Sequence, residues 1–393
     1  MTFEHDRRVD ESSLDHGLLG EDASDASGAP ACLVAPGSSQ SCRVVTEVEV
    51  GLDPEGVVVD PRTDLAYVSC SRSNSVTIVD LRDMSLRGRL EVGREPIDIA
   101  IDVPTGRLFT ADARSDQVTV IETLSAGEAG PGRVVGTVPV GSYPAGLAVD
   151  EQARRLYCGD TMGSTMSVVD VDSLERVAVV PAELGAGAIA VDSVMKRAYC
   201  VNFVTGTVTV VETEGLTVMS TVRVGEGPCA VVVDQRTRDV FVINSLASTV
   251  VRIDASSLDP VAEFPVPNAP VGLTASPLGD RIYTGNRGDG SMSVFGLDGT
   301  EWERVPVGTA PGGVAVHPTN PRRVLVANAG TGSLSLIEDL LEGPSESSRR
   351  KMSHPLVGAR LPDFALPDLH SGKVRHQSEW AEKKYILNFF ASW

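Results

Sequence analysis

The chain has 393 residues and a formal net charge of −19, with 42% hydrophobic but only 5% aromatic residues. A surface this acidic repels phosphate backbones, so we expect no nucleic-acid partner. No stretch reaches the roughly 18 apolar residues that a membrane helix needs, so we predict no membrane span. Frequent Val, Gly, Thr, Ser and Asp favour short strands and tight turns over helices.

The first segment, residues 1–40, is acidic, contains many Ser and Gly, and has few large apolar side chains. Such a composition buries too little apolar surface to fold, so we predict a disordered acidic tail. The segment lacks the apolar run of a secretory signal, which predicts a cytoplasmic protein. Export stays open if translation starts elsewhere.

One sequence pattern recurs seven times between residues 41 and 343, at a spacing of about 42 residues. Each copy begins its first apolar run at a proline or its equivalent: Pro54, Pro96, Pro144, Ala186, Pro228, Pro270 and Pro311. The one longer interval contains residues 125–132, which we interpret as a surface loop. Internal repetition of this period indicates a repeat architecture.

A polar residue follows each proline position by six residues: Asp60, Asp102, Asp150, Asp192, Asp234, Ser276 and His317. Such side chains can bond nearby backbone amides and so close a turn at a strand end, as can the Asp and Asn residues that end the second strand. Recurrence argues against a catalytic or metal-binding ring, because one substrate needs one acid and one base. His317 departs from the series and is a candidate functional residue, although the turn that follows explains it as well.

The apolar runs of each copy indicate four short antiparallel strands, which is typical of a propeller blade. The seventh copy has no fourth strand after Glu338, whereas residues 43–50 form a strand that no other copy uses. We therefore predict an all-β, seven-bladed β-propeller in which residues 43–50 supply the outer strand of the last blade. This closure hides two sheet edges.

The runs Tyr67-Val68-Ser69-Cys70, Tyr199-Cys200-Val201-Asn202 and Phe241-Val242-Ile243-Asn244 resemble the Tyr-Val-Thr-Asn repeats of YVTN-type seven-bladed propellers. The resemblance covers about residues 43–340. It implies a binding platform, a surface-associated protein or, among lactonase-like propellers, a hydrolase. We accordingly expect a protein or small-molecule ligand on one propeller face.

The starts of the first strands are expected to line a central channel. They are mostly Gly, Ala, Ile and Val, which offer no obvious nucleophile. Residues that vary between blades at these entries form a predicted binding rim: Arg94, Glu95, Tyr143, Glu226 and Asn268.

The six cysteines show no Cys-x-x-Cys spacing, and the six histidines are scattered. The sequence therefore has no zinc or haem signature, and we predict neither a metal site nor a cofactor. Cys158 and Cys200 each follow the tyrosine of a repeat, so we expect them on equivalent strands as small buried hydrophobic residues.

The composition changes beyond residues 344–356, a polar linker. Residues 357–369, which include Pro362-Asp363-Phe364-Ala365-Leu366, resemble the opening of redoxins, the peroxiredoxin-like and thiol–disulfide oxidoreductase branch of the thioredoxin superfamily. Ser371-Gly372-Lys373-Val374 matches the hairpin turn that follows in that family, and residues 385–393 match its central strand. Arg360-Leu361 replaces the usual small-residue pair, which is a departure from the family pattern.

This resemblance implies that residues 357–393 are the N-terminal part of a thioredoxin-like α/β domain. The nucleophilic Cys of a Cys-x-x-Cys motif, or a selenocysteine, is expected immediately after the approach strand Phe389, Phe390, Ala391, Ser392, Trp393. Residues 1–393 then contain no catalytic residue and should be inactive. A longer chain is expected to be a thiol- or selenol-dependent oxidoreductase that reduces disulfides or peroxides with a thiol protein as redox partner. The alternatives are a non-enzymatic propeller binding protein and a lactonase-like hydrolase.

Overall fold

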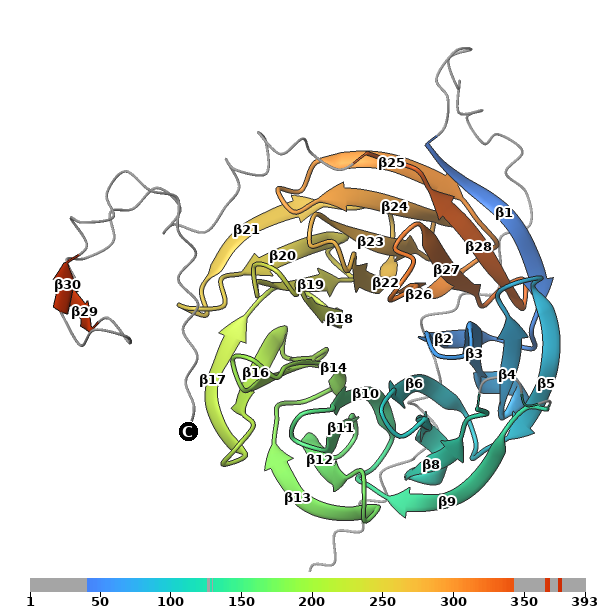
Figure 1. Cartoon of the computed structure of the whole chain (residues 1–393), viewed down its shortest axis with the longest axis horizontal. Helices are drawn as coiled ribbons and strands as arrows, with labels where there is room; N and C mark the ends of the chain where they lie inside the picture. Colours follow the sequence, from blue (N-terminus) through green and yellow to red (C-terminus); the bar gives the residue numbers. More distant parts are fainter. Residues whose placement is uncertain (1–40, 126–127, 129, 343–364, 368–373, 377–393) are drawn as a thin grey trace, which may run out of the picture. The chain divides into compact units, whose positions relative to one another are not determined.

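The computed structural model describes residues 41–125, 128, 130–342, 365–367 and 374–376. Within residues 41–342, seven four-stranded antiparallel sheets surround a central axis (Figure 1). The predicted all-β, seven-bladed propeller is therefore confirmed. Helical structure in the described segments consists of two 3-10 turns, η2 (Ser71–Ser73) and η3 (Ala113–Ser115). None of the helices described there has the length or apolar character to cross a membrane.

The first strand of each repeat lies nearest the axis, and the sheet extends outward from it (Figure 1). The innermost strands are β2 (Pro54–Asp60), β6 (Pro96–Asp102), β10 (Pro144–Asp150), β14 (Ala186–Asp192), β18 (Pro228–Val233), β22 (Pro270–Ala275) and β26 (Pro311–Val316). The second strands are β3 (Leu65–Cys70), β7 (Arg107–Asp112), β11 (Arg155–Asp160), β15 (Arg197–Asn202), β19 (Val240–Asn244), β23 (Arg281–Asn286) and β27 (Arg323–Asn328).

The third and fourth strands complete each blade. The third strands are β4 (Ser75–Asp80), β8 (Gln117–Glu122), β12 (Thr165–Asp170), β16 (Thr207–Glu212), β20 (Thr249–Ile253), β24 (Ser291–Gly296) and β28 (Ser333–Asp339). The outermost strands are β5 (Ser85–Glu91), β9 (Arg133–Pro139), β13 (Glu175–Pro181), β17 (Thr217–Arg223), β21 (Pro260–Pro265), β25 (Glu301–Pro306) and β1 (Cys42–Glu49).

The ring is closed by β1, which pairs antiparallel with β28 from Cys42↔Asp339 to Glu49↔Ser333. In Figure 1 the blue first strand lies beside the orange strands of the last blade. The predicted closure by residues 43–50 is confirmed, with the strand starting and ending one residue earlier. The last blade is thus built from both ends of the propeller sequence, so two strand edges are covered.

Two predicted connections also have structural counterparts. Residues 125–132 fall in the connection between β8 and β9. β29 (Ala365–Pro367) pairs antiparallel with β30 (Val374–His376) on either side of the turn predicted at residues 371–374, of which residues 371–373 lie outside the described residues. The predicted tail, linker and approach strand, including Phe389, Phe390, Ala391, Ser392 and Trp393, lie outside the described residues and stay predictions.

The apolar core consists of seven separate clusters, each shared by two neighbouring blades. One large side chain from each second strand fills such an interface and is fully buried: Tyr67, Phe109, Tyr157, Tyr199, Phe241, Tyr283 and Leu325. Cys158 and Cys200 are also fully buried, on the equivalent strands β11 and β15, as predicted. Packing between blades, rather than within one, therefore stabilises the ring.

The polar residues that end the first strands cap turns, as predicted. The amides of Gln152 and Ala153 each donate to Asp150 Oδ1 at 3.0 Å. His317 does the same with a ring nitrogen: Nδ1 accepts from the Asn320 amide at 3.1 Å and from the Thr319 amide at 3.3 Å. An imidazole nitrogen thus replaces the carboxylate oxygen that five blades use and the Ser276 hydroxyl of the sixth, and turn geometry accounts for His317.

The Asp and Asn residues that end the second strands were predicted to bond their own local backbone, and this prediction is wrong. Asn286 Nδ2 donates to the hydroxyls of Ser291 and Ser293 at 3.0 Å each, on the adjacent third strand. Asn328 repeats this arrangement in the last blade. These side chains are fully buried, so their polar groups need partners, and the hydroxyls five and seven residues later supply them.

Candidate functional site

The predicted rim residues all lie on the connections that lead into innermost strands, one or two residues before the proline position. We call this side of the propeller the entry face. Arg94, Glu226 and Asn268 are exposed there, whereas Glu95 and Tyr143 are half-buried. Glu95 and Tyr143 come from adjacent blades and are in contact, because the Tyr143 hydroxyl donates to Glu95 Oε1 at 2.7 Å.

Backbone conformation sets the direction of these two side chains. Glu95 and Tyr143 have φ values of 57° and 56°, in the left-handed region that non-glycine residues rarely occupy. Each precedes a proline at the start of a strand, where the right-handed helical region is disfavoured for the preceding residue. Glu95 also forms an ion pair with Arg114 of the same blade. Burial raises the pKa of Tyr143 to about 12, and the bond to Glu95 adds to this effect, so the phenol stays a donor.

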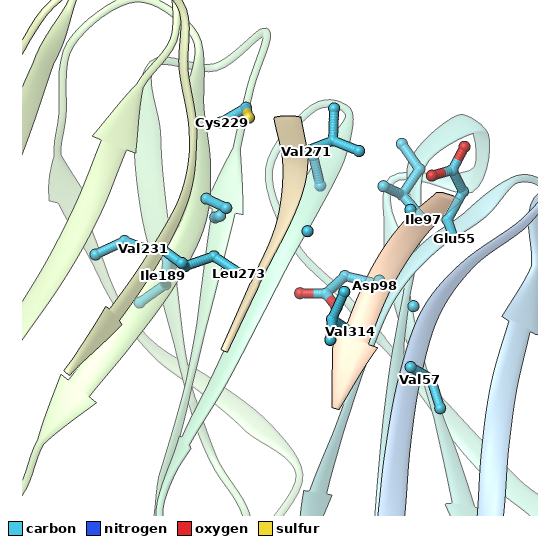
Figure 2. A pocket seen from close by; sticks show the side chains of 17 residues that line it. Glu55, Val57, Ile97, Asp98, Ile189, Cys229, Val231, Val271, Leu273 and Val314 are labelled. Carbon is cyan, nitrogen blue, oxygen red and sulfur yellow. The ribbon is translucent and has the colours of Figure 1, made fainter. Parts of the chain in front are cut away.

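Below the rim, residues from all seven innermost strands enclose a channel with a volume of about 300 Å³ (Figure 2). The side chains on its walls are mainly small or aliphatic, which agrees with the sequence prediction for the strand starts, while backbone groups and carboxylates add polar surface. The larger apolar side chains are Val57, Ile97, Ile189, Val231, Val271, Leu273 and Val314. A cavity of this size is at the lower end of the range for small-molecule sites.

Asp98 breaks the symmetry of the channel. It lies two residues after the proline position on β6, where the other six blades have Gly or Ala. Its carboxylate points into the pocket in Figure 2. Oδ1 accepts from the Ile99 amide and Oδ2 from the Leu147 amide of the next blade, each at 2.8 Å. Burial raises its pKa to about 6, because these two bonds only partly offset the loss of solvation.

A second asymmetric feature is an ion pair at the channel entrance. Arg287 Nη2 lies 2.8 Å from both carboxylate oxygens of Glu55, although the two residues belong to blades six and one. Gly312, on the blade between them, leaves room for this pair, because a Cβ there would lie 3.1 Å from Glu55 Oε2. Burial raises the pKa of Glu55, while Arg287 opposes that rise.

The cysteines of the described chain are free thiols. Cys229 lines the channel, and its Sγ lies 3.6 Å from the Pro270 carbonyl oxygen. Burial raises its pKa to about 12 and that of Cys200 also to about 12. Because the thiolate is the reactive form, the described thiols are poor nucleophiles near neutral pH.

His317 does not belong to this channel. It directly follows β26, at the opposite end of an innermost strand from the entry face, and its Nε2 lies 2.9 Å from Asp64 Oδ1. The structure therefore does not bring His317 together with Asp98 or Glu55. Among the described residues, no three His, Cys, Asp or Glu side chains are placed to hold a metal ion.

Sequence reasoning did not single out Asp98, Glu55 or Arg287. An alignment of the seven repeats on their proline positions would have identified two of these residues. Asp98 and Glu55 are acidic at positions where the other repeats have small or apolar residues. Arg287 gives no such signal, because its partner lies 232 residues away in the sequence.

Comparison with known proteins supports the fold and goes no further. No family model matches the sequence. No curated protein matches it either. Among solved structures, a chain of Kuenenia stuttgartiensis hydrazine synthase is similar, with a TM-score of 0.65 and 18% identity, covering 75% of this chain and 97% of that chain. At this identity the similarity shows a shared fold alone. The class of the protein is therefore that of the seven-bladed β-propellers.

Proposed function

We propose that the propeller is a binding scaffold whose ligand enters the central channel from the entry face. The observation that supports this proposal is the break in sevenfold symmetry at the channel. The other blades have small or apolar side chains at these positions, and Asp98 and Glu55 are exceptions in an otherwise repeated structure. Partly buried carboxylates cost solvation energy, so their presence in a channel favours a binding role.

The arrangement at the entrance also suits ligand capture. The Glu55–Arg287 and Glu95–Tyr143 contacts place polar groups around a cavity that also exposes aliphatic side chains. Ligand sites commonly combine apolar walls with a few fixed polar groups that determine orientation. The same geometry fits the predicted small-molecule ligand on a propeller face.

Saturation-transfer NMR with a panel of small cationic, neutral and anionic fragments tests this proposal. Ala145 lines the channel and is partly exposed, so Ala145→Phe should fill the channel without entering the core. Val194→Phe is the matched control, because Val194 is exposed outside the channel. We expect fragments that bind the wild type and Val194→Phe but not Ala145→Phe. Binding that is equal in all three proteins would contradict a channel site.

We further propose that residues 357–393 begin a redoxin domain and that the propeller presents its ligand to that domain. The β29–β30 hairpin supports this second proposal, because it forms where the redoxin resemblance expects one. A complete domain of this kind would use a thiolate or selenolate to attack a disulfide or peroxide, and a second Cys would resolve the intermediate. The longer protein would then be a thiol- or selenol-dependent oxidoreductase.

An activity comparison tests this second proposal. Residues 1–393 should show no disulfide reductase or peroxidase turnover, because the nucleophile is expected after Trp393. A chain extended through a complete redoxin domain should show turnover with a thiol protein as electron donor. Turnover by residues 1–393 would contradict the proposed place of the nucleophile. A non-enzymatic binding protein predicts no turnover in either chain.

A further inference from the structure

The Asp98 carboxylate is an uncompensated anion in the channel. Its hydrogen-bond partners are two backbone amides, and no Lys, Arg or His within the described chain forms an ion pair with it. By contrast, Glu55 already has Arg287 as a partner. A carboxylate removed from bulk water without a cation is costly, so a ligand that brings positive charge would be favoured there.

The hydrogen-bonding capacity of the Asp98 carboxylate indicates which kind of cation would bind there. An ionised carboxylate offers about four acceptor sites, and the Ile99 and Leu147 amides occupy two of them. The remaining sites suit N–H donors of an ammonium group. A calcium ion would need about six to eight oxygen ligands, whereas the side chains of Ile189, Val231 and Leu273, which also line the channel, supply none.

The channel walls define the rest of the ligand. The channel of about 300 Å³ combines aliphatic side chains with polar surface from backbone groups and carboxylates, and the aliphatic side chains offer contacts to a short carbon chain. Figure 2 shows Asp98 among Leu273, Ile189 and Val314, with Glu55 toward one end of the pocket. A cation would also be attracted by the net charge of −19.

We infer that the channel binds a small organic cation, with a primary ammonium group on the Asp98 carboxylate and an aliphatic chain along Ile189, Val231 and Leu273. This inference rests on the proposed function of the channel and assigns its ligand class. The ammonium would enter past the Glu55–Arg287 and Glu95–Tyr143 contacts. Asp98 thereby acts as the anion that distinguishes amines from neutral molecules of the same shape.

Calorimetric titration with n-butylammonium, 1-butanol and butyrate tests the ligand class, since the three probes have similar carbon chains and differ in charge. At about pH 7.5 the wild type should bind butylammonium at least about tenfold more tightly than butanol, with butyrate weakest. Asp98→Asn should abolish the preference for butylammonium. Glu175→Gln, which removes an exposed acid on the outermost strand β13, away from the channel and its rim, should keep it.

The pH dependence of binding provides a second measurement. Burial raises the pKa of Asp98 to about 6, so butylammonium affinity of the wild type should fall between about pH 7.5 and about pH 5 while butanol affinity stays constant. Burial keeps the Cys158 and Cys229 thiols neutral in this range, but it also raises the pKa of Glu55 at the channel entrance. The same titration of Asp98→Asn separates the two carboxylates, because a fall caused by Asp98 should be absent from that variant.

The outcomes separate this inference from the proposed function. Equal or tighter binding of butanol or butyrate, lost in Ala145→Phe, would overturn the ligand class and leave the channel as a site. An undiminished ammonium preference in Asp98→Asn would overturn the role of Asp98. If Ala145→Phe changes the binding of none of the three probes, both the ligand class and the channel site are wrong.

Discussion

Arg281 and Asp339 form an ion pair of 2.9 Å between blades six and seven, and each side chain is only 3% exposed. Asp339 also accepts from the Tyr283 hydroxyl at 2.6 Å and from the Cys42 thiol at 3.3 Å. The Arg281 guanidinium lies 4.9 Å from the ring centre of Trp302. This buried network meets the first residue of β1, so the ring is closed by side chains as well as by strand pairing.

Arg281→Met should destabilise the propeller by about 3–5 kcal/mol, because it leaves the buried Asp339 carboxylate without its cation. Chemical denaturation measures this loss. Arg43→Met is the matched control: the Arg43–Glu338 pair joins β1 to β28, the strand that also carries Asp339, but Arg43 is 64% exposed, so its loss should cost under about 1 kcal/mol. Equal effects of the two changes would contradict a buried closure network.

Asn286→Ala should lower the free energy of unfolding by about 1–3 kcal/mol. The change removes three hydrogen bonds and leaves the hydroxyls of Thr284, Ser291 and Ser293 without their Asn286 partner. Asn268→Ala, at an exposed position of the same blade boundary, should change stability by less than about 0.5 kcal/mol. Denaturant midpoints of the two variants give the comparison. An Asn286→Ala variant as stable as the wild type would refute the proposal that Asn286 stabilises the contact between the second and third strands.

His317→Ala should cost about 1–2 kcal/mol, since the amides of Thr319 and Asn320 lose their acceptor. His317→Asn should recover about half of this loss, because an Asn side chain can close the same turn. Neither variant should change fragment binding in the channel, which lies at the other end of the strands. A variant that folds normally but loses ligand binding would restore a functional role for His317.

Asp98 should make stability depend on pH between about 4 and 6. Burial raises its pKa in the folded state to about 6, so the folded protein holds this proton more tightly than the unfolded chain. The resulting stabilisation is complete below about pH 4 and is lost as the pH rises through about 6.

The difference in unfolding free energy between wild type and Asp98→Asn isolates this effect, because other titrating groups cancel between the two proteins. That difference should shift in favour of the variant as the pH rises from about 4.5 to about 7. A difference that is constant with pH would show that Asp98 keeps an ordinary pKa in the folded state.

The architecture could be predicted from the sequence because each repeat carries its own local signals. Turn residues such as Asp60 and Asp150 mark the end of each first strand, and the buried tyrosines mark the second. Ring closure by β1 followed from one missing strand in the last repeat. These features depend on residues close together in the chain, so their spacing alone predicts them.

The candidate site was harder to predict from the sequence, because it consists of departures from the repeat. Asp98 was hidden in the general description of small and apolar strand starts. The Glu55–Arg287 and Arg281–Asp339 pairs join different blades, and no local pattern specifies which charges meet across the ring. The role of Asn286 was misjudged because its hydroxyl partners lie on the adjacent strand rather than in its own turn.

The function of the propeller depends on whether residues 357–393 begin a redoxin domain. The genomic sequence that follows the Trp393 codon tests this most directly. The redoxin proposal predicts a Cys codon or an in-frame UGA at the next position, a Cys codon at Cys-x-x-Cys spacing, and a redoxin-like remainder. A stop codon followed by no redoxin-like reading frame would contradict it and leave the protein as a propeller scaffold without its own redox chemistry.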